Sequence, residues 1–347
     1  MAEGNGPLAQ GSDVTPSSDL QPPQKGKKVQ VVAAIAVVIV LVVAVVIVVE
    51  NMSFLFNIGK EKEIAPVYPE ESAIITNSTP TFEWEGIPGI SSYRFQLSLD
   101  IDFDHPIIDI VVNGTSYTID HPLEENRSYF WRLMPYDTDE AEWTPVWDFF
   151  IGYNVFTRTY NWEYEGNSWS LTVNIPGDDY YEYSTRARSS NYASYVISND
   201  PVIYQLAYKL NNMAEKEGYE NTLKAEFVLA FVQSLPYFYD NESKGVVEYP
   251  RYPIETLVDN GGDCEDTAIL FVSLIQTEVL NFDGILLLFT GDPSHMAAGI
   301  WVDSSIPGVY YFYHDKSYYY CETTSEGWGI GEVPGDYEGR SARVIDC

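Results

Sequence analysis

The segment Gly261–Asp266, with the sequence GGDCED, places a cysteine where a helix is predicted to begin. Two glycines permit a sharp entry, Asp263 is a favourable N-cap, and apolar residues then recur at helical spacing: Ala268, Ile269, Val272, Ile275, Val279 and Leu280. The first helical turn leaves N–H groups unsatisfied and carries positive charge, which favours the thiolate of Cys264. The acidic neighbours oppose this effect unless they cap amides or hold a cation. The segment therefore predicts a nucleophilic Cys264 at a helix start.

Further along the chain, His295 opens a predicted half-buried strand over residues 294–302, directly after a hydrophobic strand over Ile285–Phe289. An imidazole that reaches a thiol can accept its proton, so the two residues predict a cysteine–histidine pair. The alternative is purely structural, because cysteine is often buried and a histidine at a strand start is often only hydrogen-bonded.

Three segments carry a resemblance to a known family: Tyr249–Leu257, Gly262–Leu270 and His295. Together they resemble the transglutaminase-like superfamily, in particular its prokaryotic cysteine-peptidase branch, over roughly residues 160–334. The resemblance implies an α+β, papain-like catalytic domain in which helices meet an antiparallel sheet. It also implies that Cys264 is the nucleophile and His295 its base.

The third catalytic residue of that family is a carboxylate on the following strand. The family usually has an aspartate there, whereas this chain offers Glu322, whose longer side chain a small backbone adjustment could accommodate. Asp303 and Asp315 remain rivals, because spacing alone does not show which carboxylate faces His295.

Some relatives bind calcium through carboxylates beside the nucleophile, and Asp263, Glu265 and Asp266 stand at the matching positions. Oxygen ligands suit this hard cation. The alternative is that these acids only cap the helix and complement its dipole. Calcium is therefore a candidate ligand, and the resemblance implies no obligatory cofactor.

Residues 31–49 are uncharged and apolar, about 28 Å long as a helix, which is enough to cross the hydrocarbon core of a bilayer. We therefore predict a disordered tail over residues 1–28, a transmembrane helix over 29–50 and a linker over 51–65. Five glycosylation sequons follow the span, and three lysines precede it: Asn51, Asn77, Asn113, Asn126 and Asn241, and Lys25, Lys27 and Lys28. This arrangement favours a cytoplasmic N-terminus and extracellular C-terminal domains. A cleavable signal peptide is the alternative, although no small-residue cleavage site follows the apolar run.

Residues 66–152 are predicted to form an all-β sandwich from six short alternating runs: 81–84, 93–99, 107–112, 115–119, 128–134 and 146–151. Alternation places Tyr93, Phe95, Leu97 and Leu99 on one face, opposite Arg94, Gln96 and Ser98, and Trp84 and Trp131 in the core. The segment Leu123–Tyr129 resembles the tyrosine corner of fibronectin type III domains.

Residues 153–347 are predicted to form the transglutaminase-like domain, beginning with two strands over 159–164 and 169–175. A helix should start at the N-cap Asp200 and stop at Gly218, and a second should run over 222–235 and pack behind the nucleophile helix. Gln233, near the end of that second helix, either approaches the active site or is only a polar end of a packing helix.

The amino-acid composition bears on the partners that the protein can bind and on the state of its cysteines. The chain has 51 acidic and 19 basic residues and a formal charge of -32, which makes nucleic acid an unfavourable partner. Only three cysteines occur, so outside the cell Cys264 could stay free beside a Cys321–Cys347 bridge, whereas inside it all three would stay reduced.

Three functions from different classes follow. The first is a membrane-anchored cysteine peptidase or amidohydrolase that acts on protein or peptide substrates at the cell surface through Cys264, His295 and Glu322. The second is a glutamine transamidase that resolves the same acyl-enzyme with an amine. The third is a non-catalytic surface-interaction protein, against which the presence of both Cys264 and His295 argues.

Overall fold

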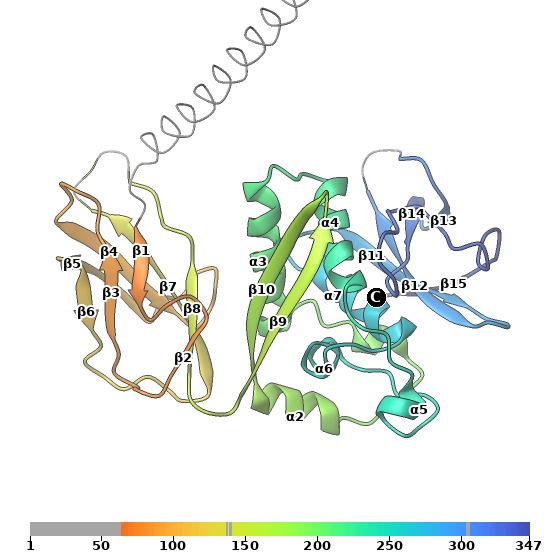
Figure 1. The fold of residues 1–347 in the computed structure, drawn as a ribbon, viewed down its shortest axis with the longest axis horizontal. Coiled ribbons are helices and arrows are strands. Elements are labelled where there is room, and N and C mark those ends of the chain that lie inside the picture. Colours follow the sequence, from red (N-terminus) through yellow and green to blue (C-terminus); the bar gives the residue numbers. More distant parts are fainter. Residues whose placement is uncertain (1–63, 137, 139–140, 303–305) are drawn as a thin grey trace, which may run out of the picture. The chain divides into compact units, whose positions relative to one another are not determined.

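A computed structural model describes residues 64–136, 138, 141–302 and 306–347 (Figure 1). The predicted tail over residues 1–28, the predicted transmembrane helix over 29–50 and nearly all of the linker lie outside these ranges. Among the described residues, no helix combines the length and the apolar character that crossing a membrane requires.

The first part of the described chain forms two sheets around a single core. One sheet has the order β1-β3-β6 and the other β2-β8-β7-β4-β5. Their strands are β1 (Ala65–Tyr68), β2 (Ala73–Ile75), β3 (Thr81–Glu85), β4 (Ser92–Ser98), β5 (Ile108–Asn113), β6 (Ser116–Thr118), β7 (Arg127–Pro135) and β8 (Trp147–Ile151). All six predicted runs are confirmed as β3 to β8, and Trp84 and Trp131 lie in the core between the sheets.

The predicted faces of β4 are only partly correct. Tyr93, Phe95 and Leu97 are fully buried, but Leu99 lies beyond the end of the strand and is 38% exposed. On the opposite face, Gln96 is buried because it bonds to the side chains of Asp109 and Arg132 on the neighbouring strands. Paired polar groups therefore cover the face of β4 that lies opposite its apolar side chains.

The tyrosine corner is present as a hydrogen bond. Tyr129 Oη donates to the carbonyl oxygen of Glu124 at 3.0 Å, which ties the start of β7 to the segment before it. The fibronectin type III identity of the sandwich stays a prediction.

The second part begins with the long hairpin β9 (Val155–Tyr164) and β10 (Asn167–Pro176), which confirms and extends the two predicted strands. Its helices are α2 (Gly177–Thr185), a 3₁₀ turn η1 (Tyr192–Tyr195), α3 (Pro201–Lys216), α4 (Thr222–Gln233), α5 (Asp240–Ser243), α6 (Pro253–Asp259) and α7 (Cys264–Ile275). A five-stranded antiparallel sheet follows, with the order β13-β14-β12-β11-β15. Its strands are β11 (Asp283–Phe289), β12 (His295–Trp301), β13 (Tyr310–Tyr313), β14 (Lys316–Cys321) and β15 (Arg343–Asp346).

Local sequence signals define α3 and α4. Asp200 caps α3 by accepting a hydrogen bond from Val202 N at 2.9 Å, Pro201 occupies the first helical position, and Gly218 follows the end with a φ of 72°. The predicted apolar stripe of α4, which includes Val228 and Phe231, is completely buried. These predictions are confirmed.

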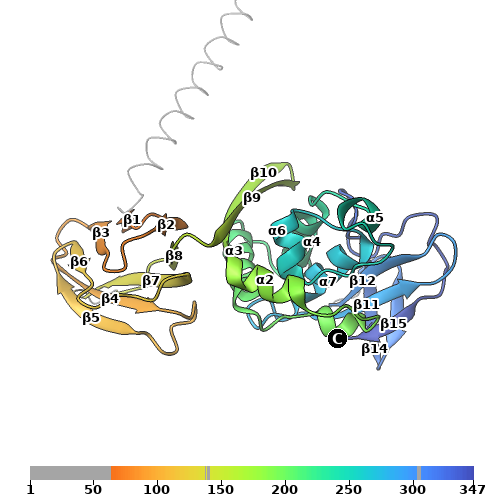
Figure 2. The ribbon, with the colours of Figure 1, turned by 90° about the horizontal axis from the view of Figure 1, so that it is seen from below.

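Helix α7 lies at the centre of the domain. It packs on β11 and β12 on one side and on α3 and α4 on the other, which buries nearly every residue from Glu265 to Ile275 (Figure 2). The helix ends at Ile275. The apolar spacing predicted a helix that includes Val279 and Leu280, so this part of the prediction is wrong. The opposite face of the sheet packs on the segment 333–342. Because the sheet is covered on both faces, β12 is almost entirely buried, and the prediction that it is half-buried is wrong.

Candidate active site

The nucleophile candidate sits at the first residue of α7, as predicted. Asp263 is the N-cap, and its backbone N–H donates to Asp266 Oδ2 at 3.2 Å, which fastens the helix start. Gly261 has a φ of 147°, and a Cβ at this position would overlap the carbonyl oxygen of Pro236. The two glycines are therefore required by the close passage of the chain before Cys264.

His295 opens β12, and its imidazole is hydrogen-bonded to the carboxylate of Glu322. The distance from His295 Nε2 to Glu322 Oε2 is 3.1 Å, and both side chains are buried. This pairing selects Glu322 among the three carboxylates considered from the sequence. Asp315 lies exposed in the turn between β13 and β14, and Asp303 lies outside the described residues.

Three further groups hold Glu322. Tyr320 Oη donates to Glu322 Oε2 at 2.7 Å, and Thr324 donates to Oε1 through its hydroxyl at 2.6 Å and its backbone N–H at 3.1 Å. Burial alone would raise the pKa of Glu322, but these hydrogen bonds and the charge of His295 lower it to about 2. Glu322 is thus a fixed, ionised partner for the imidazole.

Cys264 lies beside the start of β12. The backbone N–H of Met296, the residue after His295, donates toward the Cys264 sulfur and thereby favours its thiolate. The ring of Tyr337, which stacks on His295, is close enough to Cys264 for a negative charge there to raise the pKa of the Tyr337 phenol. The thiol of Cys264 and the imidazole of His295 therefore lie near each other, at one end of the sheet.

The acidic neighbours dominate the electrostatics of the thiol. Cys264 Sγ donates a hydrogen bond to Glu265 Oε2 at 3.3 Å. Burial, followed by the charges of Glu265 and Asp263, raises the pKa of Cys264 well above its usual value despite the position at a helix start. The predicted lowering of this pKa by the helix terminus is therefore outweighed by burial and by the carboxylates.

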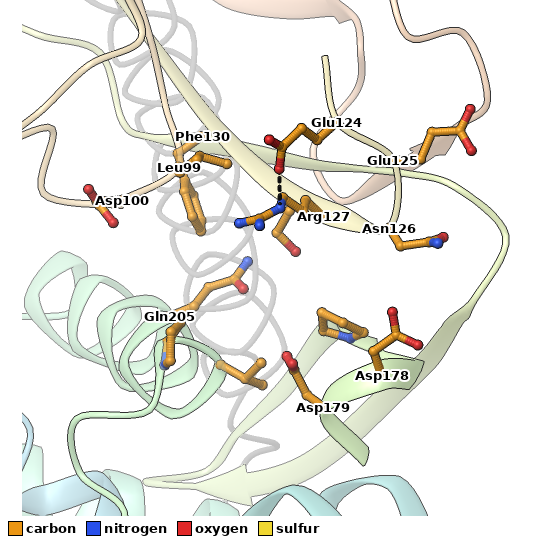
Figure 3. A pocket seen from close by; sticks show the side chains of 14 residues that line it. Leu99, Asp100, Glu124, Glu125, Asn126, Arg127, Phe130, Asp178, Asp179 and Gln205 are labelled. Carbon is orange, nitrogen blue, oxygen red and sulfur yellow. Dashed lines mark ion pairs between the residues drawn. The ribbon is translucent and has the colours of Figure 1, made fainter. Parts of the chain in front are cut away.

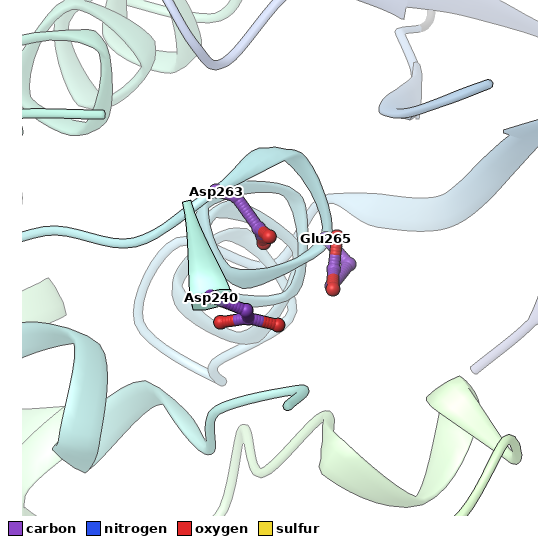
Figure 4. A group of neighbouring side chains, drawn as sticks. All are labelled: Asp240, Asp263 and Glu265. Carbon is purple, nitrogen blue, oxygen red and sulfur yellow. The ribbon is translucent and has the colours of Figure 1, made fainter. Parts of the chain in front are cut away.

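Asp240, Asp263 and Glu265 form a compact carboxylate cluster, whose ligand atoms lie within 4.8 Å of one another (Figure 4). Two buried oxygens in the cluster, Asp263 Oδ1 and Glu265 Oε1, have no hydrogen-bond partner. Burial and mutual repulsion raise the pKa values of both of these residues. Orphaned buried oxygens that converge in this way fit a hard divalent cation such as calcium.

Asp266, the third residue predicted to hold calcium, points elsewhere. Its carboxylate forms a short ion pair with Arg251 Nη1 and accepts from Arg251 N at 2.6 Å. The predicted set is therefore corrected: Asp240, from α5, converges with Asp263 and Glu265, and Asp266 supports the helix start. The carboxylate of Asp266 is engaged by Arg251 and is therefore not one of the converging ligands.

The side chain of Gln233 is buried and bonds to the backbone of the segment that bears Glu322. Its side-chain amide donates to the carbonyl oxygens of Glu322 at 2.7 Å and Trp328 at 2.9 Å. Of the two interpretations from sequence, approach to the active site is the one that fits, although the contact is with the backbone of the acid rather than with the thiol.

Sequence reasoning missed four residues of the site: Asp240, Tyr320, Thr324 and Tyr337. Tyr320 and Thr324 could have been found by strand alternation, because they lie two residues on either side of Glu322. No local signal marks Asp240 or Tyr337, which tertiary packing brings from distant segments.

The bridge considered between Cys321 and Cys347 is wrong, because all three cysteines are free. Cys321 ends β14 and Cys347 follows β15, and β12 and β11 lie between these strands. At ~4.8 Å per strand the gap is about 14 Å, whereas disulfide Cα atoms lie within about 7 Å of each other.

A pocket of about 670 Å³ lies apart from this site (Figure 3). It is lined by residues around Glu124–Arg127, by Asp178 and Asp179 of α2 and by Gln205 of α3, and Glu124 pairs with Arg127 at 2.6 Å. Its lining does not include Cys264, His295 or Glu322, so it is not where the proposed nucleophile would meet a substrate.

Comparisons with known proteins gave matches among solved structures alone. Neither the protein-family profiles nor the curated proteins that were searched contain a match to this sequence. Calcium-bound LapG of Legionella pneumophila matches with 18% identity over 40% of this chain and 81% of that chain, at a TM-score of 0.25. A transglutaminase matches with 12% identity over 54% of this chain and 48% of that chain, at a TM-score of 0.28.

A third structure, described as a candidate cysteine protease from Cytophaga hutchinsonii, matches with 12% identity over 79% of this chain and 82% of that chain, at a TM-score of 0.25. Scores this low support no conclusion on their own.

Proposed function

We propose that this chain is a cysteine hydrolase of transglutaminase-like type that cleaves protein or peptide amides. The observation that carries the proposal is the buried His295–Glu322 pair, at 3.1 Å, beside the helix start that bears Cys264. A histidine held by an ionised acid next to a cysteine at a helix terminus is the arrangement that nucleophilic catalysis requires.

The roles follow from the contacts. Because His295 Nε2 is engaged by Glu322, Nδ1 is the atom left to accept the thiol proton. The sulfur then bonds to the amide carbonyl carbon, backbone N–H groups at the start of α7 stabilise the oxyanion, and His295 returns the proton to the leaving amine. Water, deprotonated by His295, cleaves the thioester and restores the thiol.

Activation requires the thiol to change its partner. In the structure Cys264 Sγ donates to Glu265, so its proton has to turn toward His295 before attack. We propose that a calcium ion held by Asp240, Asp263 and Glu265 occupies the cluster, since the free oxygens of Asp263 and Glu265 fit it. Such an ion supplies positive charge beside the thiol.

The setting of this activity is proposed from the sequence. The apolar segment over residues 29–50 would anchor the chain and leave the sandwich and the hydrolase domain outside the cell, facing surface proteins or peptides.

The test is the rate at which iodoacetamide labels Cys264 in the full chain in detergent. A Cys347→Ser background is needed because Cys347 is free and exposed, whereas Cys321 is free but buried. We expect His295→Ala to slow labelling at pH 7 about 10–100-fold, because the general base is lost, and Cys264→Ala to abolish it. The matched control is His314→Ala, an exposed histidine, which should leave the rate unchanged. Labelling at the full rate in His295→Ala would refute the pair.

Calcium is tested by stability as well as by activity. Three buried carboxylates within 4.8 Å repel one another, so an ion that binds only the folded state raises its unfolding free energy, by about 2.7 kcal/mol at a hundredfold excess over Kd. We expect the melting temperature to rise by several degrees on replacing EGTA with calcium. Asp240→Asn should remove most of this shift, whereas Glu242→Gln, an exposed acid of the same helix, should retain it. An unchanged melting temperature in the unsubstituted chain would exclude the site.

A further inference from the structure

The imidazole of His295 lies beside two aromatic rings that sequence reasoning did not assign to the site. The ring centroid of Tyr337 is 4.5 Å from that of His295, with an interplanar angle of 21°. Phe289, the strand partner of His295, has its ring centroid 6.3 Å away at 29°. Tyr337 and Phe289 also contact each other, at 5.5 Å. The histidine ring is therefore stacked face to face with Tyr337 within an aromatic cluster.

Arg340 ties the segment that bears Tyr337 to the loop that leads into His295. Its Nη1 donates to the carbonyl oxygen of Pro293 at 3.0 Å and its Nη2 to that of Thr290 at 3.0 Å. The guanidinium carbon also lies 5.2 Å from the centroid of the Tyr337 ring. One side chain thus sets the distance between Tyr337 and the backbone just before His295.

The hydrogen bond to Glu322 alone does not fix the imidazole. It restrains Nε2 but leaves the ring free to rotate about the line through that bond, which would swing Nδ1 away from Cys264. A parallel ring at stacking distance removes this rotation.

We propose that Tyr337 is a positioning residue for His295, held in place by Arg340, and that it sets the plane of the imidazole. The inference rests on the proposed cysteine–histidine–glutamate hydrolase. It goes beyond that proposal, because it assigns a specific role to a side chain that touches neither the thiol nor the acid through a hydrogen bond.

Substitutions that separate ring stacking from packing test this role in the full chain with the Cys347→Ser background. Tyr337→Phe keeps the stacked face, whereas Tyr337→Leu fills part of the same space without one. We expect Tyr337→Phe to label with iodoacetamide within about 2-fold of the parent, and Tyr337→Leu to label 10–30-fold more slowly. In the leucine variant, turnover of p-nitrophenyl acetate should fall in kcat rather than in KM.

A purely structural role predicts otherwise. If Tyr337 only fills space, the leucine variant should match the parent in labelling rate and in kcat, and this outcome would overturn the inference. Equal losses in the phenylalanine and leucine variants would overturn it as well, because they would point to the hydroxyl. Where the leucine variant is poorly folded, Arg340→Gln supplies the second test, with the same direction of change in labelling rate and in kcat expected.

An independent readout is the ring-current shift of the His295 Hδ2 proton in NMR spectra. The proton should be shifted upfield in the parent and in Tyr337→Phe and should lose this shift in Tyr337→Leu, and an unshifted proton in the parent would contradict the stack. Failure of the proposed hydrolase mechanism and failure of the proposed role of Tyr337 give different results. Full-rate labelling in His295→Ala would end the hydrolase mechanism, whereas loss in His295→Ala together with a normal Tyr337→Leu would end only this inference.

Discussion

Replacing Glu322 by glutamine is expected to lower the kcat for p-nitrophenyl acetate on the order of 10²–10³-fold. Glutamine keeps the shape of the side chain but removes the negative charge that faces His295 Nε2 at 3.1 Å. Without that charge the imidazolium is less stable, and an amide that presents its NH₂ group would favour the wrong tautomer. The loss should appear in kcat with little change in KM, because Glu322 acts on the transition state through His295.

Glu326→Gln is the matched control, since Glu326 is an exposed acid of the same loop. It should retain the parent rate, and equal rates in the two variants would remove Glu322 from the mechanism.

Glu322 also makes the free energy of unfolding depend on pH. The pKa of Glu322 falls from its usual value of 4.5 to about 2 in the fold, so the ionised form is the one that folding stabilises. This contribution, about 3 kcal/mol, is fully present above pH 4.5 and is lost as the pH falls toward 2. Glu322→Gln should therefore show a flatter decline of unfolding free energy across this window in urea titrations, whereas Glu326→Gln should follow the parent.

Replacing Arg251 by leucine is expected to destabilise the hydrolase domain by about 3–5 kcal/mol. Arg251 is 1% exposed and binds three carboxylates, those of Asp240, Asp259 and Asp266. Removing the guanidinium leaves the buried charges of Asp240 and Asp266 uncompensated beside Asp263 and Glu265. Urea unfolding of the purified chain measures the loss.

A surface arginine is the control for this prediction. Arg186→Leu breaks an exposed pair with Glu182 and should cost less than about 1 kcal/mol. Adding Asp266→Asn to Arg251→Leu should recover part of the lost stability, because it removes one orphaned charge. Equal losses for the two arginines would show that the buried cluster does not depend on Arg251.

Much of the site could be predicted from local sequence because its parts lie at the ends of regular elements. An N-cap followed by apolar residues at helical spacing located the start of α7, and alternation located β12 with His295 at its first residue. The carboxylate that pairs with His295 was predicted less firmly. Spacing left Glu322, Asp303 and Asp315 open, and the antiparallel pairing of β14 with β12 placed Glu322 beside His295.

The sequence by itself determined strands β3 to β12, helices α3 and α4, the cysteine at a helix start and the histidine at a strand start, because capping and periodicity act over a few neighbouring residues. Only the tertiary structure decided the members of the carboxylate cluster, the raised pKa of Cys264 and the stacking of Tyr337 on His295. The physical reason is that burial and Coulomb interactions depend on distance in space. Asp240 and Tyr337 lie far from Cys264 along the chain, and folding alone brings them to it.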